Sequence, residues 1–95
     1  MRSVQDWLRY MATWERDRRL NVWHLALLQA IVQLAYRQSQ SKVIRVSRSR
    51  LMTLSHINTL PTYHKYFKEL QIFGYINYNP SYHPGFRSTI ELKIP

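Results

Sequence analysis

The sequence predicts a small, mainly α-helical domain that ends in a β-hairpin. Four segments place apolar residues three or four positions apart, which is the spacing of a helix with one buried face. Near the carboxyl end, two segments alternate between apolar and polar residues around a turn that contains Pro and Gly, as in a hairpin. The chain has 95 residues, of which 45% are hydrophobic, so a single folded unit is expected.

The first predicted helix runs from Ser3 to about Arg18, and Ser3 can cap its free N–H groups. Its apolar residues form one stripe, made by Val4, Trp7, Leu8, Met11 and Trp14. This stripe needs a partner surface, either the next helix or a second copy of the chain. We therefore divide the chain into an N-terminal amphipathic helix, residues 1–19, and a main domain, residues 20–95.

The second predicted helix begins after the N-cap Asn21 and ends near Gln38. Apolar residues occupy almost every side of it, which predicts a central helix with neighbours on several sides. A lone histidine in such a helix, here His24, is more often a packed or capping side chain than a metal ligand.

Shorter elements follow the second helix. Residues 38–42 are polar and predict a loop, and the β-branched residues that follow predict a strand over Lys42–Val46. Ser47 is placed to cap a short helix over Arg48–Leu54, whose buried side comprises Leu51, Met52 and Leu54. Residues 55–58 predict a turn.

The last predicted helix begins at the cap Thr59, carries Pro61 in its first turn, and ends near Phe73 before Gly74. Its apolar stripe is Tyr63, Phe67 and Leu70, flanked by Tyr66 and Phe73.

The hairpin comprises a strand over Tyr75–Asn79, a turn over residues 80–85 and a strand over Ser88–Ile94. Together these elements predict one core around the second helix. Its expected members are Leu28, Ile31, Leu51, Phe67, Leu70, Ile76 and Leu92.

The charge of the chain favours a polyanionic partner. Fourteen Lys and Arg stand against five Asp and Glu, a formal net charge of +9. No carboxylate occurs between Asp17 and Glu69, an interval that contains nine basic residues. Basic domains gain affinity for nucleic acids because each neutralised phosphate releases condensed counterions. Simple solvation of a small cationic protein, or an acidic protein partner, would also fit the charge.

Residues 47–76 resemble the pattern of winged helix-turn-helix DNA-binding domains. In that pattern a polar-capped helix and a turn lead to a Thr-rich helix start. The second helix then ends in a K-E-L motif, followed by an L-G-Y-I type entry into the wing. Here these are Lys68-Glu69-Leu70 and Phe73-Gly74-Tyr75-Ile76. The resemblance extends over about residues 21–94. The sequence is also similar to small winged-helix proteins of bacterial mobile elements and replication modules. The family's usual Gly or Asn in the turn between the two helices is met here only by Asn58, and the turn has no Gly.

The resemblance implies sequence-specific binding of double-stranded DNA by a transcriptional regulator, or by an accessory protein of a mobile element or replication system. The helix that begins at Thr59 would enter the major groove. The residues expected to face the DNA from it are Thr59, Thr62, His64, Lys65 and Lys68, because they lie off the apolar stripe.

Two further regions complete the implied DNA site. Arg48, Ser49 and Arg50 open the preceding helix, whose N-terminus can meet a phosphate. In the hairpin loop, His83 and Arg87 can reach the minor groove or the backbone. The aromatic residues of that loop can instead fold the hairpin onto the body of the domain.

Other function classes find little support. The five carboxylates form no recognisable acid–base pair, and the four histidines lack zinc-site spacing and cysteine companions. Two glycines cannot make a phosphate-binding loop. We therefore expect no enzyme and no cofactor. With no apolar run of bilayer length and no secretory signal, we expect a cytoplasmic, nucleoid-associated protein.

Two alternatives concern partners. Winged-helix domains also serve as protein–protein interaction modules, which would expose an apolar patch where a DNA-binding protein exposes cations. For the N-terminal helix, we favour a homodimer over packing within the chain, because two-fold DNA-binding proteins gain affinity from two half-sites.

Overall fold

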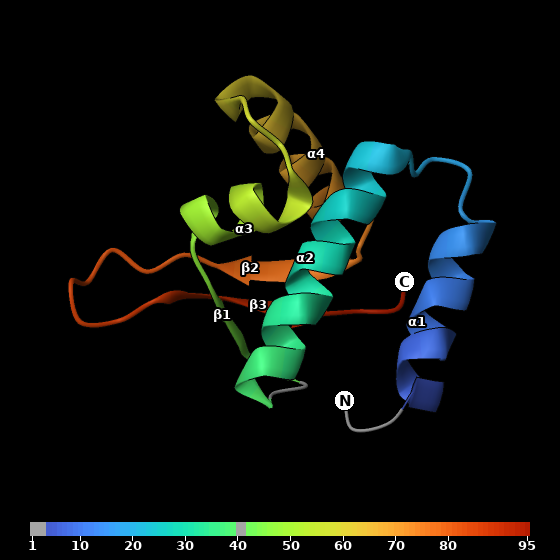
Figure 1. Ribbon diagram of the computed structural model, residues 1–95, viewed down its shortest axis with the longest axis horizontal. Coiled ribbons are helices and arrows are strands. Elements are labelled where there is room, and N and C mark those ends of the chain that lie inside the picture. Colours follow the sequence, from blue (N-terminus) through green and yellow to red (C-terminus); the bar gives the residue numbers. More distant parts are fainter. Residues whose placement is uncertain (1–3, 40–41) are drawn as a thin grey trace.

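The computed structural model describes residues 4–39 and 42–95, and these form four helices and a small antiparallel sheet (Figure 1). The helices are α1 (Val4–Arg16), α2 (Val22–Gln38), α3 (Arg48–Ser55) and α4 (Leu60–Ile72). The strands are β1 (Ile44–Val46), β2 (Ile76–Asn79) and β3 (Ser88–Leu92). The predicted order of elements is therefore confirmed, with helix ends that differ from prediction by one or two residues. Ser3, which we expected to cap α1, and residues 40–41 of the predicted loop lie outside the described residues.

The sheet is larger than the predicted hairpin. Its strand order is β1-β3-β2, so β3 pairs with both other strands. Ile44 lies opposite Ile90, and Ile76 lies opposite Leu92, all four with buried side chains. The prediction of a strand from Lys42 was too long at its start, because β1 begins at Ile44, where its pairing with β3 begins. The last strand was also predicted too long, since β3 ends at Leu92 and the Ile94 side chain is exposed.

Helix α2 lies at the centre of the molecule and packs against α3, α4 and β1. All seven residues that were predicted to form the core are found in one buried cluster, which confirms that prediction. The same cluster contains side chains that were not predicted, among them Trp14, Ile57 and Tyr75. A single core thus positions α3, α4 and the sheet relative to one another.

The prediction that α2 is a central helix with neighbours on several sides is confirmed, although some of its apolar side chains are not covered. Val22, Trp23, Leu25 and Tyr36 are exposed on this helix. Helices α3 and α4 and strand β1 contact it, and between α2 and α1 lies an apolar hollow that Trp7 and Met11 of α1 line with Tyr36 of α2.

The N-terminus of α2 is built around His24, which is buried. The Asn21 side chain accepts hydrogen bonds from the backbone N–H groups of Trp23 and His24, and His24 Nδ1 accepts one from Asn21 N at 2.9 Å. Since Nδ1 accepts, the ring proton lies on Nε2, which donates to Glu69 Oε1 on α4 at 2.7 Å. The prediction that His24 is a packed or capping residue is confirmed.

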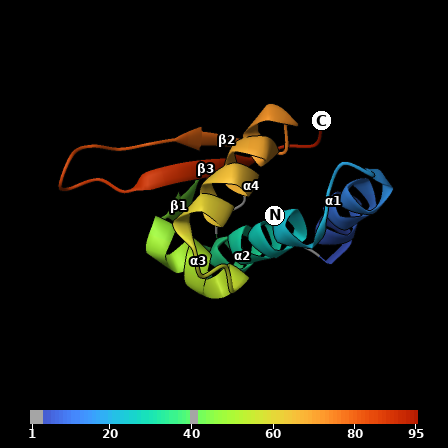
Figure 2. The same ribbon diagram turned by 90° about the horizontal axis from the view of Figure 1, so that it is seen from above.

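Helix α1 lies at one end of the molecule, and the β2–β3 loop extends at the other (Figures 1 and 2). Trp14 is 3% exposed and belongs to the core, with Trp7 and Met11 half-buried beside it, whereas Leu8 is 55% exposed. The remaining member of the predicted stripe, Val4, has a side chain outside the described part. Helix α1 therefore extends the core of its own chain.

Three helices end in the left-handed conformation, and the first of them is α2, which ends at Ser39 with φ 52°. Gly74 follows α4 with φ 87°, and the Gly74 and Tyr75 N–H groups donate to Gln71 O and Leu70 O, as in a Schellman motif. His56 ends α3 with φ 60°, and Ile57 N donates to Met52 O at 3.1 Å. The same motif buries the Ile57 side chain, which explains why a residue of a predicted turn belongs to the core.

Candidate nucleic-acid interface

Helix α4 presents a basic surface opposite its buried stripe. Tyr63, Phe67 and Leu70 are buried, as predicted, and His64, Lys65 and Lys68 are exposed. Lys65 Nζ lies 5.2 Å from the centre of the Tyr66 ring, and the His64 ring meets the Tyr63 ring edge-on at 5.4 Å. The rings of Tyr63 and Tyr66 thus contact the exposed polar side chains that follow or precede them on α4.

The start of α4 differs from the prediction. Thr59 occupies the N-cap position, but its side chain makes no capping hydrogen bond. Its hydroxyl instead donates to Thr62 Oγ1 at 2.8 Å. Thr62 is half-buried in a small hollow beside Trp23 and Pro61, so the expectation that it faces fully outward was wrong. The position of Thr62 on the flank of α4 nearest α2 accounts for this.

The start of α3 matches the prediction. Ser47 Oγ accepts a hydrogen bond from Arg50 N at 3.2 Å, which caps the helix. Arg48, Ser49 and Arg50 are all exposed around this terminus. Their backbone N–H groups and side chains therefore lie where a phosphate can approach.

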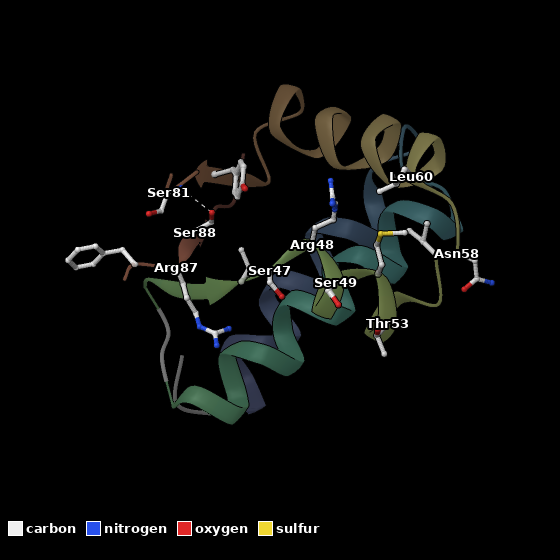
Figure 3. A pocket seen from close by; sticks show the side chains of 14 residues that line it. Ser47, Arg48, Ser49, Thr53, Asn58, Leu60, Ser81, Arg87 and Ser88 are labelled. Atoms are coloured by element: carbon white, nitrogen blue, oxygen red, sulfur yellow. Dashed lines mark hydrogen bonds between the residues drawn. The ribbon is translucent and has the colours of Figure 1, made fainter. Parts of the chain in front are cut away.

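A groove of about 830 Å³ lies between these helices and the hairpin. Ser47, Arg48 and Ser49 line it from the start of α3, and Leu60 lines it from the start of α4. Figure 3 shows the Arg48 side chain directed from α3 towards α4. On the hairpin side the lining comprises Tyr78, Ser81, Phe86, Arg87 and Ser88.

The hairpin loop stays away from the body of the domain. Tyr82 is 91% exposed and Phe86 is 74% exposed, so the alternative in which these aromatic side chains fold the loop onto the core is wrong. His83 is also exposed and meets the Phe86 ring edge-on at 6.2 Å. Where the hairpin returns, Ser88 Oγ accepts a hydrogen bond from Ser81 N at 3.0 Å.

The structure brings part of the predicted site together. Three of the predicted residues, Arg48, Ser49 and Arg87, line the groove itself. The others do not line it: Thr59, Thr62, His64, Lys65 and Lys68 belong to the start and outer faces of α4, Arg50 to α3, and His83 to the hairpin loop.

Comparison with family models, curated proteins and solved structures gives no match for this chain.

Three carboxylates, those of Asp17, Glu69 and Glu91, have partners outside the groove lining. Glu69 accepts the hydrogen bond from His24, and Glu91 accepts one from Asn77 Nδ2 at 3.3 Å. The Arg19 guanidinium and the Tyr75 hydroxyl hold the pKa of the Asp17 carboxyl well below its usual range. No Asp or Glu lines the groove, so its field is set by the arginines.

The buried Tyr63 hydroxyl on α4 is affected by Arg48, which lines the groove. Burial raises the pKa of Tyr63 well above its usual value, and nearby Arg48 opposes this shift. The Tyr63 hydroxyl is therefore protonated, and so uncharged, at neutral pH.

Sequence reasoning missed Arg37 and Arg45. Arg45 lies between two buried residues of β1, and this alternation marks its side chain as outward-facing. Arg37 lies in the last turn of α2. Both approach α3 and the hairpin only in the folded chain, which explains why no local pattern grouped them with the predicted residues.

Among residues 4–39 and 42–95, no three His, Asp or Glu side chains gather to hold a metal ion. The helices of this part of the chain are too short or too polar to cross a lipid bilayer.

Proposed function

We propose that this chain is a winged helix-turn-helix protein that binds double-stranded DNA, with α4 in the major groove. The order α2-β1-α3-α4-β2-β3 and a three-stranded sheet support this assignment. In such domains the helix after the turn reads the bases, and the hairpin is the wing. The 13 residues of α4 make a rod about 20 Å long. A helix is about 10–12 Å in diameter and the major groove is about 12 Å wide, so α4 fits in it.

The observation that carries the proposal is a groove bordered by α3, α4 and the hairpin that arginines line and no carboxylate lines. Arg48 lines it from α3 and Arg87 from the hairpin, and Lys65 and Lys68 are exposed nearby in the sequence of α4. A duplex presents two rows of phosphates beside the major groove, so a helix in the groove needs cations on both flanks. The start of α3 and the wing supply these flanks.

The side chains divide into two classes by position. His64, Lys65 and Lys68 on α4 are assigned to base edges, with Thr59 and Thr62 at the end of the helix that enters first. Arg48, Ser49 and Arg50 are assigned to phosphates on one flank, and His83 and Arg87 to the backbone or minor groove on the other. The proposed cellular role is that of a regulator, or of an accessory protein of a mobile element or replication system, in the cytoplasm with the nucleoid.

A second candidate is a protein–protein interaction module. Exposed apolar side chains around the same surface favour it, notably Leu60, Ile72, Tyr82 and Phe86. They are interspersed with His64, Lys65 and Lys68, whereas a protein-binding patch would be continuous and apolar. The charge of this surface therefore favours DNA.

The test is selection of bound duplexes from a random pool, followed by titration of the selected and scrambled duplexes at several salt concentrations. The proposal predicts an enriched sequence, tighter binding to it, and a linear fall of log affinity with log salt. If the intact protein bound no duplex even at low salt, the interaction module would replace the DNA-binding proposal.

A further inference from the structure

Four arginines surround a second hollow beside the groove. It has a volume of about 310 Å³. Arg37 comes from the end of α2, Arg45 from β1, Arg50 from α3, and Arg87 from the chain just before β3. Ser47 and Gln38 add polar atoms, and Leu34 is the apolar member of the lining.

Hydrogen bonds fix the backbone that carries these side chains. Gln38 Nε2 donates to Arg45 O at 2.7 Å, and Arg45 N donates to Gln38 Oε1 at 2.9 Å. This pair of bonds joins the end of α2 to β1, so Arg37 and Arg45 are held close together. Arg87 is placed by the pairing of Ser88 with Val46, which brings the start of β3 next to Ser47.

The electrostatics of the hollow favour an anion. No carboxylate lines it, and within the described residues none of the four guanidinium groups forms an ion pair. Four positive charges around so small a volume repel one another unless a negative group neutralises them. The C-terminal end of α2 offsets only part of this repulsion, through its partial negative charge.

A phosphate fits this chemistry best. The planar guanidinium donates two parallel hydrogen bonds to phosphate oxygens, and several arginines together surround the group on different sides. The hollow is open to solvent on the same side of the chain as the DNA groove, because Ser47 and Arg87 line both. Figure 3 shows Arg87 directed from the hairpin towards α2, away from the groove centre.

We propose that this four-arginine pocket binds a backbone phosphate of the DNA next to the segment that α4 reads. This inference rests on the proposed function and extends it. The DNA backbone runs past Ser47 from the groove into the pocket, so the footprint reaches the end of α2. Arg37 and Arg45 then contribute to affinity but not to the choice of sequence, since phosphates carry no base identity.

The experiment compares DNA binding of the full chain with that of the double variant Arg37→Gln, Arg45→Gln. We expect roughly tenfold weaker binding between about 50 and 200 mM salt, equally on selected and scrambled duplexes. The salt slope should fall by about one unit, because one phosphate contact is lost. The Arg37→Lys, Arg45→Lys variant keeps the charge and should restore most of the salt slope. Its affinity for DNA should lie between that of the parent chain and that of the double Gln variant.

A matched control removes the same charge elsewhere. Arg9 and Arg16 are exposed on α1, at the end of the molecule opposite the wing. Arg9→Gln with Arg16→Gln lowers the net charge equally, and it should leave the salt slope within error of the parent. If this control reduced affinity and slope as much as the pocket variant, a general charge effect would explain both results and the pocket proposal would fail.

The outcomes separate the pocket from the proposed function. If the parent binds duplex but Arg37→Gln, Arg45→Gln binds it with unchanged affinity and slope, only the pocket proposal is wrong. If the parent binds no duplex, both fail. Titration calorimetry with inorganic pyrophosphate tests whether the pocket instead binds a free phosphate compound. Tight binding that the pocket variant abolishes, with DNA affinity unchanged, would assign the pocket to a free phosphate compound and overturn its assignment to the DNA backbone.

Discussion

The Tyr75 hydroxyl donates a hydrogen bond to Asp17 Oδ2 at 2.6 Å and so joins the segment after α1 to the residue that precedes β2. Arg19 completes the cluster, with Nη2 at 2.7 Å from the same carboxylate oxygen and its guanidinium 4.4 Å from the centre of the Phe73 ring. Burial, reinforced by the hydrogen bond to Asp17, raises the pKa of Tyr75 to about 12. The cluster fixes the connection from α1 to the core without a buried unpaired charge.

This cluster predicts a pH-dependent contribution to stability. The pKa of Asp17 is lower in the folded chain than its ordinary value, so its contribution is present above about pH 4 and is lost as the pH falls further. Asp17→Asn should lower the free energy of unfolding by roughly 1–2 kcal/mol at neutral pH, and the difference should shrink below about pH 4. Urea denaturation over a pH series measures this, with exposed Glu15→Gln as the control. A difference that stays constant down to pH 2 would contradict this account.

The left-handed residue at the end of α3 predicts a stabilising substitution. His56 has φ 60°, a conformation that costs residues with a Cβ about 1–2 kcal/mol and costs glycine little. Allowing for the greater freedom of glycine in the unfolded chain, His56→Gly should raise stability by about 0.5–1 kcal/mol. The control is His64→Gly inside α4, which should lower stability by about 1 kcal/mol. Thermal and urea unfolding should show a gain of stability for His56→Gly and a loss for His64→Gly. A loss of stability in both variants would refute the prediction.

A large loss of stability is predicted for a substitution at Leu70, which is fully buried where α4 packs against the rest of the core. Leu70→Ala should lower the free energy of unfolding by roughly 2–5 kcal/mol, because it removes apolar contacts and leaves a cavity. Ile72 lies two positions along the same helix and is 69% exposed, so Ile72→Ala should change stability by less than about 0.5 kcal/mol. Equal effects in urea denaturation would show that α4 packs by another face.

Much of this fold was predictable because the signals are local. The caps Asn21 and Ser47, the C-terminal Gly74 and the alternation of the hairpin each act within a few residues, and the structure confirms them. The pairing of Ile44 with Ile90 could not be predicted in this way. It joins residues 46 positions apart (90 − 44), and a three-residue strand carries too little alternation to indicate its partner.

The candidate site shows the same contrast between local signals, which could be predicted, and long-range contacts, which could not. The exposure of Arg48, Arg50, Lys65 and Lys68 follows from helical periodicity and was predicted. The half-burial of Thr62 was not, because it depends on Trp23 of a different helix. The four-arginine pocket was also missed, since its members come from four elements that meet only in the folded chain.

The homodimer through α1 stays a prediction. Trp7, Leu8 and Met11 line an apolar hollow of about 350 Å³ between α1 and α2, together with Val32 and Tyr36, and exposed Leu8 lies at its edge. A dimer predicts about twice the mass of one chain in light scattering at micromolar concentration. Leu8→Glu should then reduce the mass to that of one chain, while the core residue Trp14 stays packed and the fold is retained. A monomeric parent would remove the dimer.

The two proposed classes of DNA contact predict different responses. Arg50→Ala should weaken binding to selected and scrambled duplexes alike and lower the salt slope by about one unit, since it removes a phosphate contact. Lys65→Ala should cost about 1–3 kcal/mol on the selected duplex and less on the scrambled one, because a base contact is lost. Titrations of both variants on both duplexes distinguish the classes, and identical behaviour would show that Lys65 does not read bases.

The most direct test of DNA binding through α4 is titration of the selected duplex with the double variant Lys65→Ala, Lys68→Ala, beside the control Arg9→Gln, Arg16→Gln. Circular dichroism should first show that both variants are folded, since all four side chains are exposed. We predict that affinity falls at least tenfold for the α4 variant, about 1.4 kcal/mol or more, and far less for the control. Unchanged affinity of the α4 variant on the selected duplex would contradict the assignment of α4 as the helix that contacts DNA.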